Sequence, residues 1–255
     1  MSLKSIAKTS LRALSLAGMN PLSARQLRYL PRFLRDRREF LRQGGKIGAN
    51  WPVLIDYADS AGVASGHYFH QDLLVAQFIY AANPRSHADV GSRIDGFVAH
   101  VAAFRPIDIL DIRPQAILAH PNIQFVQADL MQPLVDLVEG YDSVSSLHAL
   151  EHFGLGRYTD TIDVNGHIAG FNSVLSLVKQ GGTIYISFPI GRRRVEFNAH
   201  RVFGPADILE WGKGRISLIR FDYVDDKGIL HKEQPISAAV GLNYGCGIYT
   251  LTKIH

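Results

Sequence analysis

HADVGSRIDG, residues 87–96, is the stretch that most clearly predicts the fold of this 255-residue chain. It begins as a short strand pattern, 87–91, and passes through Gly91 into a helical pattern over 94–104. A glycine at such a turn lets the backbone approach a ligand closely, and the start of the next helix favours anionic or polar groups. The stretch therefore predicts the first strand-to-helix turn of an α/β domain, with a ligand site at the turn.

Strand and helix patterns alternate along most of the remaining chain. Helices are predicted at residues 71–82, 94–104, 167–179 and 205–211, and strands at 87–91, 107–112, 123–128, 142–148, 183–188, 215–224 and 246–253. Such alternation is typical of a parallel sheet with helices on both faces. We therefore expect an α/β, Rossmann-like three-layer sandwich around a mostly parallel seven-stranded sheet.

Three carboxylates, Asp89, Asp111 and Asp129, lie at the ends of three successive predicted strands. The carboxyl ends of such strands form one crevice, where open α/β sheets bind their ligands. Asp111, about 20 residues beyond the turn, is placed to accept hydrogen bonds from the ribose hydroxyls of an adenosine. The side chain of Asp129 is placed to read the adenine amino group. The alternative is that all three are helix caps and turn residues, positions that aspartate favours.

Five features, taken in order along the chain, resemble the class I S-adenosylmethionine-dependent methyltransferases. They are Asp89-Val90-Gly91-Ser92, Asp111, Asp129, YDSVSSLHALEH (141–152) and VKQGGTIYIS (178–187). The resemblance covers residues 67–253. It implies S-adenosylmethionine as the cofactor and an antiparallel last strand in the sheet. It also implies a set of cofactor-binding residues: Asp89, Gly91, Ser92, Gly96, Asp111, Asp129 and His148.

Arg93 and Asp95 depart from that family, in which these positions are commonly glycine or another small residue. Either the turn binds the cofactor through Gly91, Ser92 and Gly96, or binding has been altered or lost. The alternative function is therefore a non-catalytic Rossmann-like binding module that has lost methyl transfer. A dinucleotide-dependent enzyme is disfavoured, because the turn lacks the Gly-x-Gly-x-x-Gly pattern.

Three segments more narrowly resemble DUF268, a family known only as a domain of unknown function. They are GHYFHQD (66–72), LEHFGLGRY (150–158) and FNAHR (197–201). Members of that family are similar to methyltransferases and are often linked to the synthesis of surface glycans. The resemblance implies a small-molecule or glycan acceptor and O-methylation of a sugar or glycan precursor.

The predicted catalytic residues follow the fourth strand, beside the expected cofactor site. Transfer of a methyl group to a hydroxyl needs a base that removes the proton, and histidine is suited to this near neutral pH. We expect His152 to be that base, with Glu151 orienting it and His148 near the reactive methyl group. The alternative is that Glu151 and His152 only support the loop backbone.

Further polar residues are expected on the same rim of the sheet. Arg157 and Tyr158 are predicted to bind the acceptor, and so are Asn198 and Arg201, which follow the fifth strand. His200, between them, is a further candidate catalytic residue. Arg192-Arg193-Arg194 offers charge-assisted hydrogen bonds to a phosphate or an acidic sugar; a solvated basic loop is the commoner explanation.

No metal site is expected. Asp160, Asp163 and His167 carry oxygen and nitrogen donors, but their spacing matches no strong metal motif. Cys246 is the single cysteine, which excludes an internal disulfide framework and a cysteine-rich zinc site and fits a reducing cytoplasm. We expect it to be a buried structural residue.

The first 48 residues are predicted to form a basic helical arm, with residues 49–255 as the methyltransferase-like domain. Residues 1–50 contain eleven Lys/Arg and two acidic residues, a net charge of +9 in a chain whose total is +4, so the rest is net negative. Helices are predicted at 3–17 and 22–42, with a break or kink at about Leu30 caused by Pro31. GlnGlyGlyLysIleGly, residues 43–48, is the predicted linker.

The arm has two competing interpretations. It is either a solvated helical arm or a basic amphipathic surface for anionic lipid or an acidic partner. Nucleic acid is not expected, because no aromatic-rich basic platform accompanies it. No apolar run approaches membrane-spanning length and no secretory signal is evident. We expect a cytoplasmic protein. The basic arm would allow it to contact the inner face of the membrane peripherally.

Overall fold

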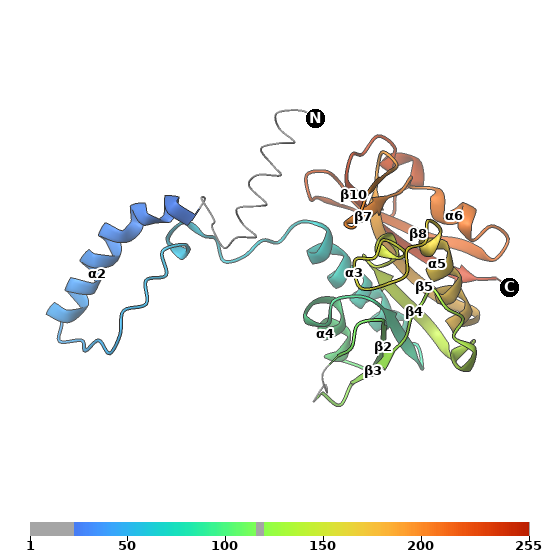
Figure 1. Cartoon of the computed structure of the whole chain (residues 1–255), viewed down its shortest axis with the longest axis horizontal. Helices are drawn as coiled ribbons and strands as arrows, with labels where there is room; N and C mark the ends of the chain where they lie inside the picture. The colour runs from blue at the N-terminus through green and yellow to red at the C-terminus, as the bar shows by residue number, and fades with distance from the viewer. Residues whose placement is uncertain (1–22, 116–119, 255) are drawn as a thin grey trace. The chain divides into compact units, whose positions relative to one another are not determined.

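The computed structural model describes residues 23–115 and 120–254 (Figure 1). The chain divides into two compact units after Val63. The helix predicted at residues 3–17 lies outside the described residues.

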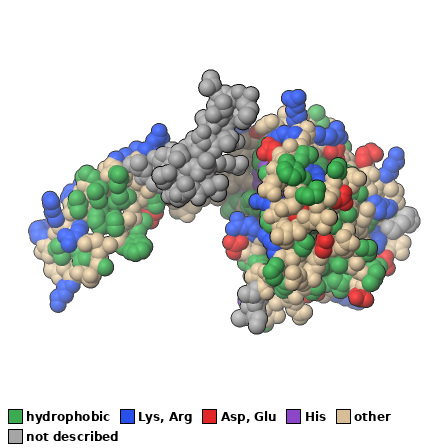
Figure 2. All heavy atoms as spheres, in the orientation of Figure 1, with side chains coloured by type: hydrophobic (Ala, Val, Ile, Leu, Met, Phe, Trp, Pro, Cys, Tyr) green, Lys and Arg blue, Asp and Glu red, His purple; other side chains and the backbone are tan. Residues whose placement is uncertain are grey.

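The first unit is built around α2 (Leu30–Arg42), which follows the 3-10 helix η1 (Ser23–Tyr29). Pro31 lies in the first turn of α2, where the N–H that proline lacks would have no helical partner. The predicted break at Leu30 is therefore the point where the two kinds of helix meet. No residue of α2 is buried, and Figure 2 shows hydrophobic and basic side chains together on the surface of this unit.

The segment after residue 48 belongs to this first unit rather than to the α/β domain. Tyr57, in the short helix η2 (Asp56–Ala58), lies 5.7 Å from the ring of Tyr29, and the guanidinium of Arg32 lies 4.3 Å over the Tyr57 ring. Arg37 donates a hydrogen bond of 2.7 Å to Asn50. Because these contacts hold the segment on the helix, the boundary falls after Val63 and not after residue 48 as predicted.

The second unit contains an eight-stranded sheet in the order β3-β2-β1-β4-β5-β10-β8-β9. Its strands are β1 (His87–Val90), β2 (Ile107–Asp111), β3 (Ile123–Gln127), β4 (Tyr141–Leu147), β5 (Val178–Ile190), β8 (Ile216–Val224), β9 (Leu230–His231) and β10 (Gly245–Lys253). The pairs from β3 to β5 are parallel, whereas β10 is antiparallel to β5 and β8. The predicted antiparallel last strand is confirmed.

Helices cover the two faces of this sheet. One face carries α3 (His67–Ala82) with η3 (Ile94–Val98) and α4 (Ala99–Ala102); the other carries α5 (Gly166–Leu177) and α6 (Asp207–Trp211) (Figure 1). The helix predicted at 94–104 is interrupted, because the backbone of Gly96 is not helical (φ −122°, ψ −109°). The predicted α/β three-layer fold is confirmed.

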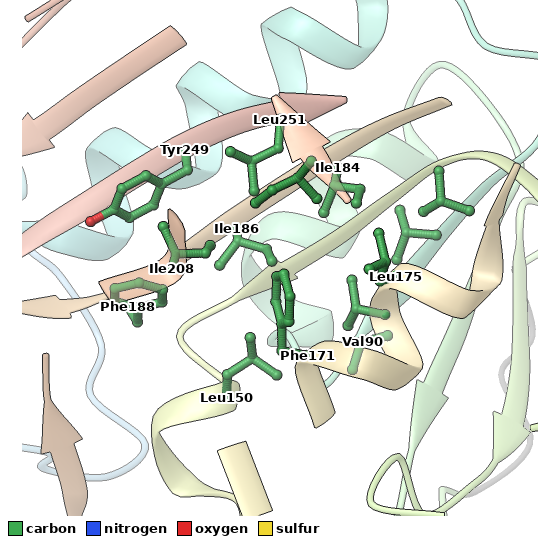
Figure 3. Packing of buried hydrophobic residues seen from close by; sticks show 14 of the residues in the cluster. Val90, Leu150, Phe171, Leu175, Ile184, Ile186, Phe188, Ile208, Tyr249 and Leu251 are labelled. Atoms are coloured by element: carbon green, nitrogen blue, oxygen red, sulfur yellow. The ribbon is translucent and has the colours of Figure 1, made fainter. Parts of the chain in front are cut away.

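Each face of the sheet has its own apolar core. Figure 3 shows the larger one, in which Val90, Phe171, Ile186 and Tyr249 are among the buried residues. The second core joins α3 and α4 to the sheet through residues such as Ile79, Phe97 and Ile109. Burial of each such side chain contributes about 1.5–3 kcal/mol. The cores hold the carboxyl ends of the parallel strands in fixed positions.

Trp211 at the end of α6 is part of an aromatic group next to the larger core. Its ring contacts Phe203 at 4.9 Å, His167 at 5.3 Å and Phe188 at 5.5 Å between centroids. These contacts attach α6 to β5 and to the segment that follows it.

Two small features were not predicted from the sequence. β6 (Arg194–Glu196) and β7 (His200–Val202) form a separate hairpin, and β9 adds two residues to the edge of the main sheet, which makes eight strands where seven were expected. Both are too short to show a strand periodicity. In the described residues, no helix has the length and apolar character needed to cross a membrane.

Candidate functional site

A cleft of about 350 Å³ opens at the carboxyl ends of β1, β2 and β4 and beside the segment after β3. Strand order reverses between β1 and β4, which is the switch point where open α/β sheets bind ligands. Among the predicted site residues, the cleft is lined by Gly91, Asp111, Asp129, His148, His152, Arg157 and Tyr158. The structure thus brings half of the predicted site residues together in one cleft.

Gly91 forms the floor of the cleft at the first turn. Its φ of +71° is in the left-handed region, and a Cβ at this position would lie 3.0 Å from the Cβ of Ala149. Glycine is therefore required both by the backbone and by the approach of the segment after β4. The turn meets the sequence expectation of a backbone exposed to a ligand.

Asp89 and Ser92 lie beneath this turn and do not line the cleft. Asp89 accepts hydrogen bonds from the Ser92 amide and hydroxyl and from the Ser145 hydroxyl, at 3.0, 2.8 and 2.6 Å. Burial raises the pKa of Asp89 to about 7, although these hydrogen bonds oppose the shift. The two residues fix the shape of the turn rather than contact a ligand in the cleft.

Gly96 also lies away from the cleft, where a Cβ would approach the Asp72 carboxylate to 2.9 Å. Arg93 does line the cleft, and its guanidinium pairs with Asp95 through a hydrogen bond of 2.8 Å. Of the three turn residues predicted to bind the cofactor, Gly91 alone lines the cleft.

Asp111 ends β2 inside the cleft and is paired with Arg113. The Arg113 amide donates to one carboxylate oxygen at 2.8 Å, and its guanidinium contacts both oxygens. The same guanidinium lies 4.5 Å over the ring of Tyr158. A ribose at Asp111 must therefore share this carboxylate with Arg113 or displace it. Sequence reasoning gave Arg113 no role, although its spacing from Asp111 was the available signal.

His148 and Glu151 form a buried pair behind the cleft wall. His148 Nδ1 is 2.7 Å from Glu151 Oε1, and the side chains are 4% and 1% exposed. Burial opposes the charge on His148, but the Cys246 thiol and the Glu151 carboxylate raise its pKa well above the ordinary value. His148 lines the cleft and Glu151 does not, so Glu151 acts through its neighbours.

His152 lies in the cleft on the 3-10 helix η5 (Leu150–His152). Its Nδ1 is 2.6 Å from the Ala199 carbonyl oxygen and 3.2 Å from the Arg157 guanidinium, which itself donates to that carbonyl. Because the shorter contact is to an oxygen that only accepts, the proton is assigned to Nδ1, and Nε2 is the basic atom. Burial, together with the charge of Arg157, lowers the pKa of His152, and Glu151 opposes this shift. The imidazole is therefore neutral near pH 7.

The loop between η5 and α5 carries Arg157 and Tyr158 over the cleft. Asp160 organises it by accepting hydrogen bonds from the amides of Gly154, Gly156 and Tyr158, at 2.7, 3.2 and 3.0 Å. These contacts explain Asp160 without a metal ion, and Asp160, Asp163 and His167 do not form a metal-binding group in the described structure.

Asn198, His200 and Arg201 lie outside the cleft, on the β6–β7 hairpin. Asn198 is in its turn with a φ of +62°, and the His200 ring contacts that of Tyr244 at a tilt of 47°, with centroids 5.2 Å apart. The buried Arg201 guanidinium donates to the carbonyls of Phe153, Asp163 and Val164 at 2.6–3.2 Å. Because its donors are used by the loop backbone, Arg201 positions the loop instead of binding a substrate directly.

Tyr68 is a cleft residue without a role in the predicted set. It lies on α3, with its ring 5.0 Å from that of His148 and 5.9 Å from the Arg93 guanidinium. The sequence signals for it were its place directly before a predicted helix and its membership of the segment GHYFHQD (66–72), which resembles DUF268.

Comparison with known proteins agrees with this geometry. Residues 121–218 match the model of a family described as "Caenorhabditis protein of unknown function, DUF268". The structure is similar to 1,6-didemethyltoxoflavin-N1-methyltransferase of Burkholderia thailandensis, solved with S-adenosylhomocysteine, with a TM-score of 0.51 and 13% identity over 72% of this chain and 79% of that one. The fold is that of the class I methyltransferases. The fold implied by the first resemblance is confirmed, and the DUF268 resemblance is matched over residues 121–218, which contain two of its three segments.

Two further methyltransferase structures have the same fold. The N-methyltransferase NodS of Bradyrhizobium japonicum, in complex with S-adenosylhomocysteine, has a TM-score of 0.50 and 11% identity over 74% of this chain and 89% of its own. A putative methyltransferase of Bacillus halodurans has a TM-score of 0.50 and 15% identity over 71% of this chain and 98% of its own. No curated protein sequence matches the chain.

Proposed function

We propose that this protein is an S-adenosylmethionine-dependent methyltransferase that methylates an oxygen of a sugar or glycan precursor. The observation that carries the proposal is the convergence of Gly91, Asp111 and Asp129 on one cleft at the switch point of a methyltransferase fold. A cleft of about 350 Å³ is in the usual range for small-molecule sites.

Each of these residues has a part in holding the cofactor. The Asp111 carboxylate accepts hydrogen bonds from the ribose hydroxyls, and Asp129 reads the adenine amino group. Gly91, without a side chain, allows the remainder of the cofactor to pass close to the backbone. When bound, S-adenosylmethionine supplies a methyl group that is activated by its sulfonium.

His152 is the general base of the proposed reaction. Its proton-free Nε2, which lies 3.8 Å from Glu151 Oε1, takes the proton of the acceptor hydroxyl as the oxygen becomes a nucleophile. The Ala199 carbonyl holds the ring in this tautomer. Because burial lowers the pKa of His152, we expect methyl transfer to be lost as the pH falls through that pKa.

The sugar acceptor is supported by the resemblance to DUF268 and by the side chains around the cleft. Tyr68 and Tyr158 offer rings on which a sugar face can stack, and Arg157 offers donors to hydroxyl or phosphate oxygens. Such a surface suits a polar acceptor that is broad and flat.

The first test is calorimetric titration of the protein with S-adenosylmethionine and S-adenosylhomocysteine. We expect saturable binding that is lost in Asp111→Asn and retained in Asp136→Asn, an exposed carboxylate outside the cleft. Absence of binding by the folded wild-type protein would overturn the proposal.

The second test is methyl transfer to a panel of sugar nucleotides and oligosaccharides, read by mass spectrometry. We expect His152→Asn to lower kcat about 10²–10⁴-fold with little change in cofactor affinity. The matched control is His120→Asn, since His120 is exposed and does not line the cleft. Equal activity in both variants would show that His152 is not the base.

One observation favours the second candidate, a binding module without turnover. Arg113 already contacts both oxygens of Asp111, the carboxylate that the ribose needs. If this pair excludes the cofactor, the wild-type protein will not bind it and Arg113→Ala will. If the Arg113 guanidinium is displaced by the ribose or shares the carboxylate with it, the wild type and Arg113→Ala will both bind the cofactor. The methyltransferase proposal then stands.

A further inference from the structure

We propose that His67, His148 and Cys246 bind a divalent metal ion of the zinc class, next to the cleft that His148 also lines. The proposal does not rest on methyl transfer. It stands on three donor atoms that the fold brings together from distant parts of the chain.

The three residues come from separate elements of the second unit. His67 is the first residue of α3, His148 follows β4, and Cys246 is the second residue of β10. One nitrogen of each imidazole and the Cys246 Sγ all lie within 4.8 Å of one another. In the described part of the chain, no other set of His, Cys, Asp and Glu donors forms such a group.

His148 presents a buried nitrogen that the protein leaves without a hydrogen bond. Its Nδ1 is held by Glu151 Oε1 at 2.7 Å, whereas Nε2 is buried and has no hydrogen-bond partner. Buried polar atoms are rarely left in this way, and each such case needs an explanation. A metal ion on Nε2 supplies one.

The Glu151–His148 contact is also the support that metal-binding histidines usually have. A carboxylate on the far nitrogen fixes the ring orientation and makes the near nitrogen a stronger donor. Glu151 is 1% exposed, so its charge is not screened by solvent.

Cys246 completes the donor set. It is fully buried, and its Sγ lies 3.6 Å from Gln71 Oε1 and 3.7 Å from the Gly247 carbonyl oxygen, besides its interaction with His148. Two imidazoles and one thiolate are donors that Zn²⁺ prefers. On binding, the thiol and the His148 Nε2 release their protons to solvent, because only the deprotonated groups are ligands.

Three protein donors leave a fourth position on a tetrahedral ion. A site with that arrangement takes a water or a substrate oxygen there, as catalytic zinc sites do. The His67 ring is held in place by stacking contacts with the rings of His148 and Tyr244, each at 5.3 Å between centroids.

The experiment uses the full chain without a histidine tag, stripped with a chelator and titrated with Co²⁺ in the absence of any cofactor. We expect one cobalt per chain, with visible d–d bands and a thiolate-to-cobalt charge-transfer band. Cys246→Ser should abolish the charge-transfer band and His67→Ala should weaken binding at least tenfold. His120→Ala, the control, should bind as the wild type does.

A second measurement needs no variant. The wild-type protein loaded with Zn²⁺ is titrated with an organomercurial, and we expect one zinc to be released as its single thiol reacts. A folded wild-type protein that binds no cobalt, or whose zinc stays bound after the thiol has reacted, would overturn the metal site. Because no cofactor is present, either result is independent of the methyltransferase proposal.

Discussion

At the scale of single residues, β1 holds two titratable groups whose pKa values are shifted by burial toward the uncharged form. His87 and Asp89 are both buried in this four-residue strand. Burial, helped by the charge of Arg105, lowers the pKa of His87 to about 3, and burial raises the pKa of Asp89 to about 7. His87 contacts the Ser143 and Ser145 hydroxyls at 2.8 and 3.2 Å. The side chains of His87 and Asp89, on the strand between β2 and β4, are therefore both uncharged in mild acid.

His87 should destabilise the folded protein as the pH falls, an effect that Asp89 opposes because its raised pKa favours the folded state over the same range. Its pKa is about 6.5 in the unfolded chain and about 3 when folded, so below pH 6.5 protons bind the unfolded state preferentially. From pH 7 to pH 5 this residue should lower the free energy of unfolding by about 2 kcal/mol. In denaturant titrations over the same pH range, the free energy of unfolding of His87→Gln should fall by about 2 kcal/mol less than that of the wild type.

The control for this prediction is His120→Gln, because His120 is exposed. It should show the same dependence on pH as the wild type. An unchanged slope in His87→Gln would mean that His87 is protonated in the folded protein.

At the scale of elements, the loop from His152 to Asp163 depends on Gly154. Gly154 has a φ of +76°, and a Cβ there would lie 2.1 Å from the Asp163 carbonyl oxygen. Gly154→Ala should therefore lower the free energy of unfolding by more than about 3 kcal/mol and should weaken cofactor binding. Denaturant titration and calorimetry measure the two effects.

Gly181 provides the matched control for that substitution. Its φ is +75°, nearly the same, but a Cβ there would have nothing within 4 Å. Gly181→Ala should cost about 1 kcal/mol, which is the backbone strain alone, and should leave binding intact. Equal losses in the two variants would contradict a steric role for Asp163.

Most of the elements could be predicted from the sequence, because long buried strands and helices carry a strong apolar pattern. Asp111 and Asp129 could be placed in the cleft for the same reason, since each ends a predicted strand. Arg201 could not be interpreted in this way. Its position after a strand suggested a substrate contact, but the hairpin turns its guanidinium to the carbonyls of the neighbouring loop.

The grouping of His67, His148 and Cys246 was also beyond the sequence. These residues are far apart along the chain, and their spacing matches no metal motif. Only the pairing of β10 with β5 and β8 brings Cys246 to the end of β4. Long-range contacts of this kind have no local signal.

At the scale of the whole molecule, the second unit has both apolar cores, and α2 of the first unit has no buried residue. Residues 64–255 should therefore fold without the rest of the chain. We expect one cooperative thermal transition with the midpoint of the full-length protein, and unchanged binding of S-adenosylhomocysteine. A molten or insoluble fragment would show that residues 1–63 are needed for folding.

The first unit should bind anionic membranes. Leu27, Leu34 and Phe40 are exposed among its arginines, a combination that favours a lipid surface with negative charge. In vesicle sedimentation, the full chain should bind vesicles that contain phosphatidylserine and should dissociate from them at high salt. It should not bind neutral vesicles. Equal binding by residues 64–255 would place the lipid contact elsewhere.

The division of the chain also separates its two indole rings. Trp51 belongs to the first unit and is 86% exposed, whereas Trp211 is packed among Phe188, Phe203 and His167 in the second. Trp51 should fluoresce at long wavelength and be quenched by iodide, and Trp211 should fluoresce at shorter wavelength and be protected. In a Trp51→Phe variant, the tryptophan emission therefore comes from Trp211 alone and reports on the folding of the second unit alone.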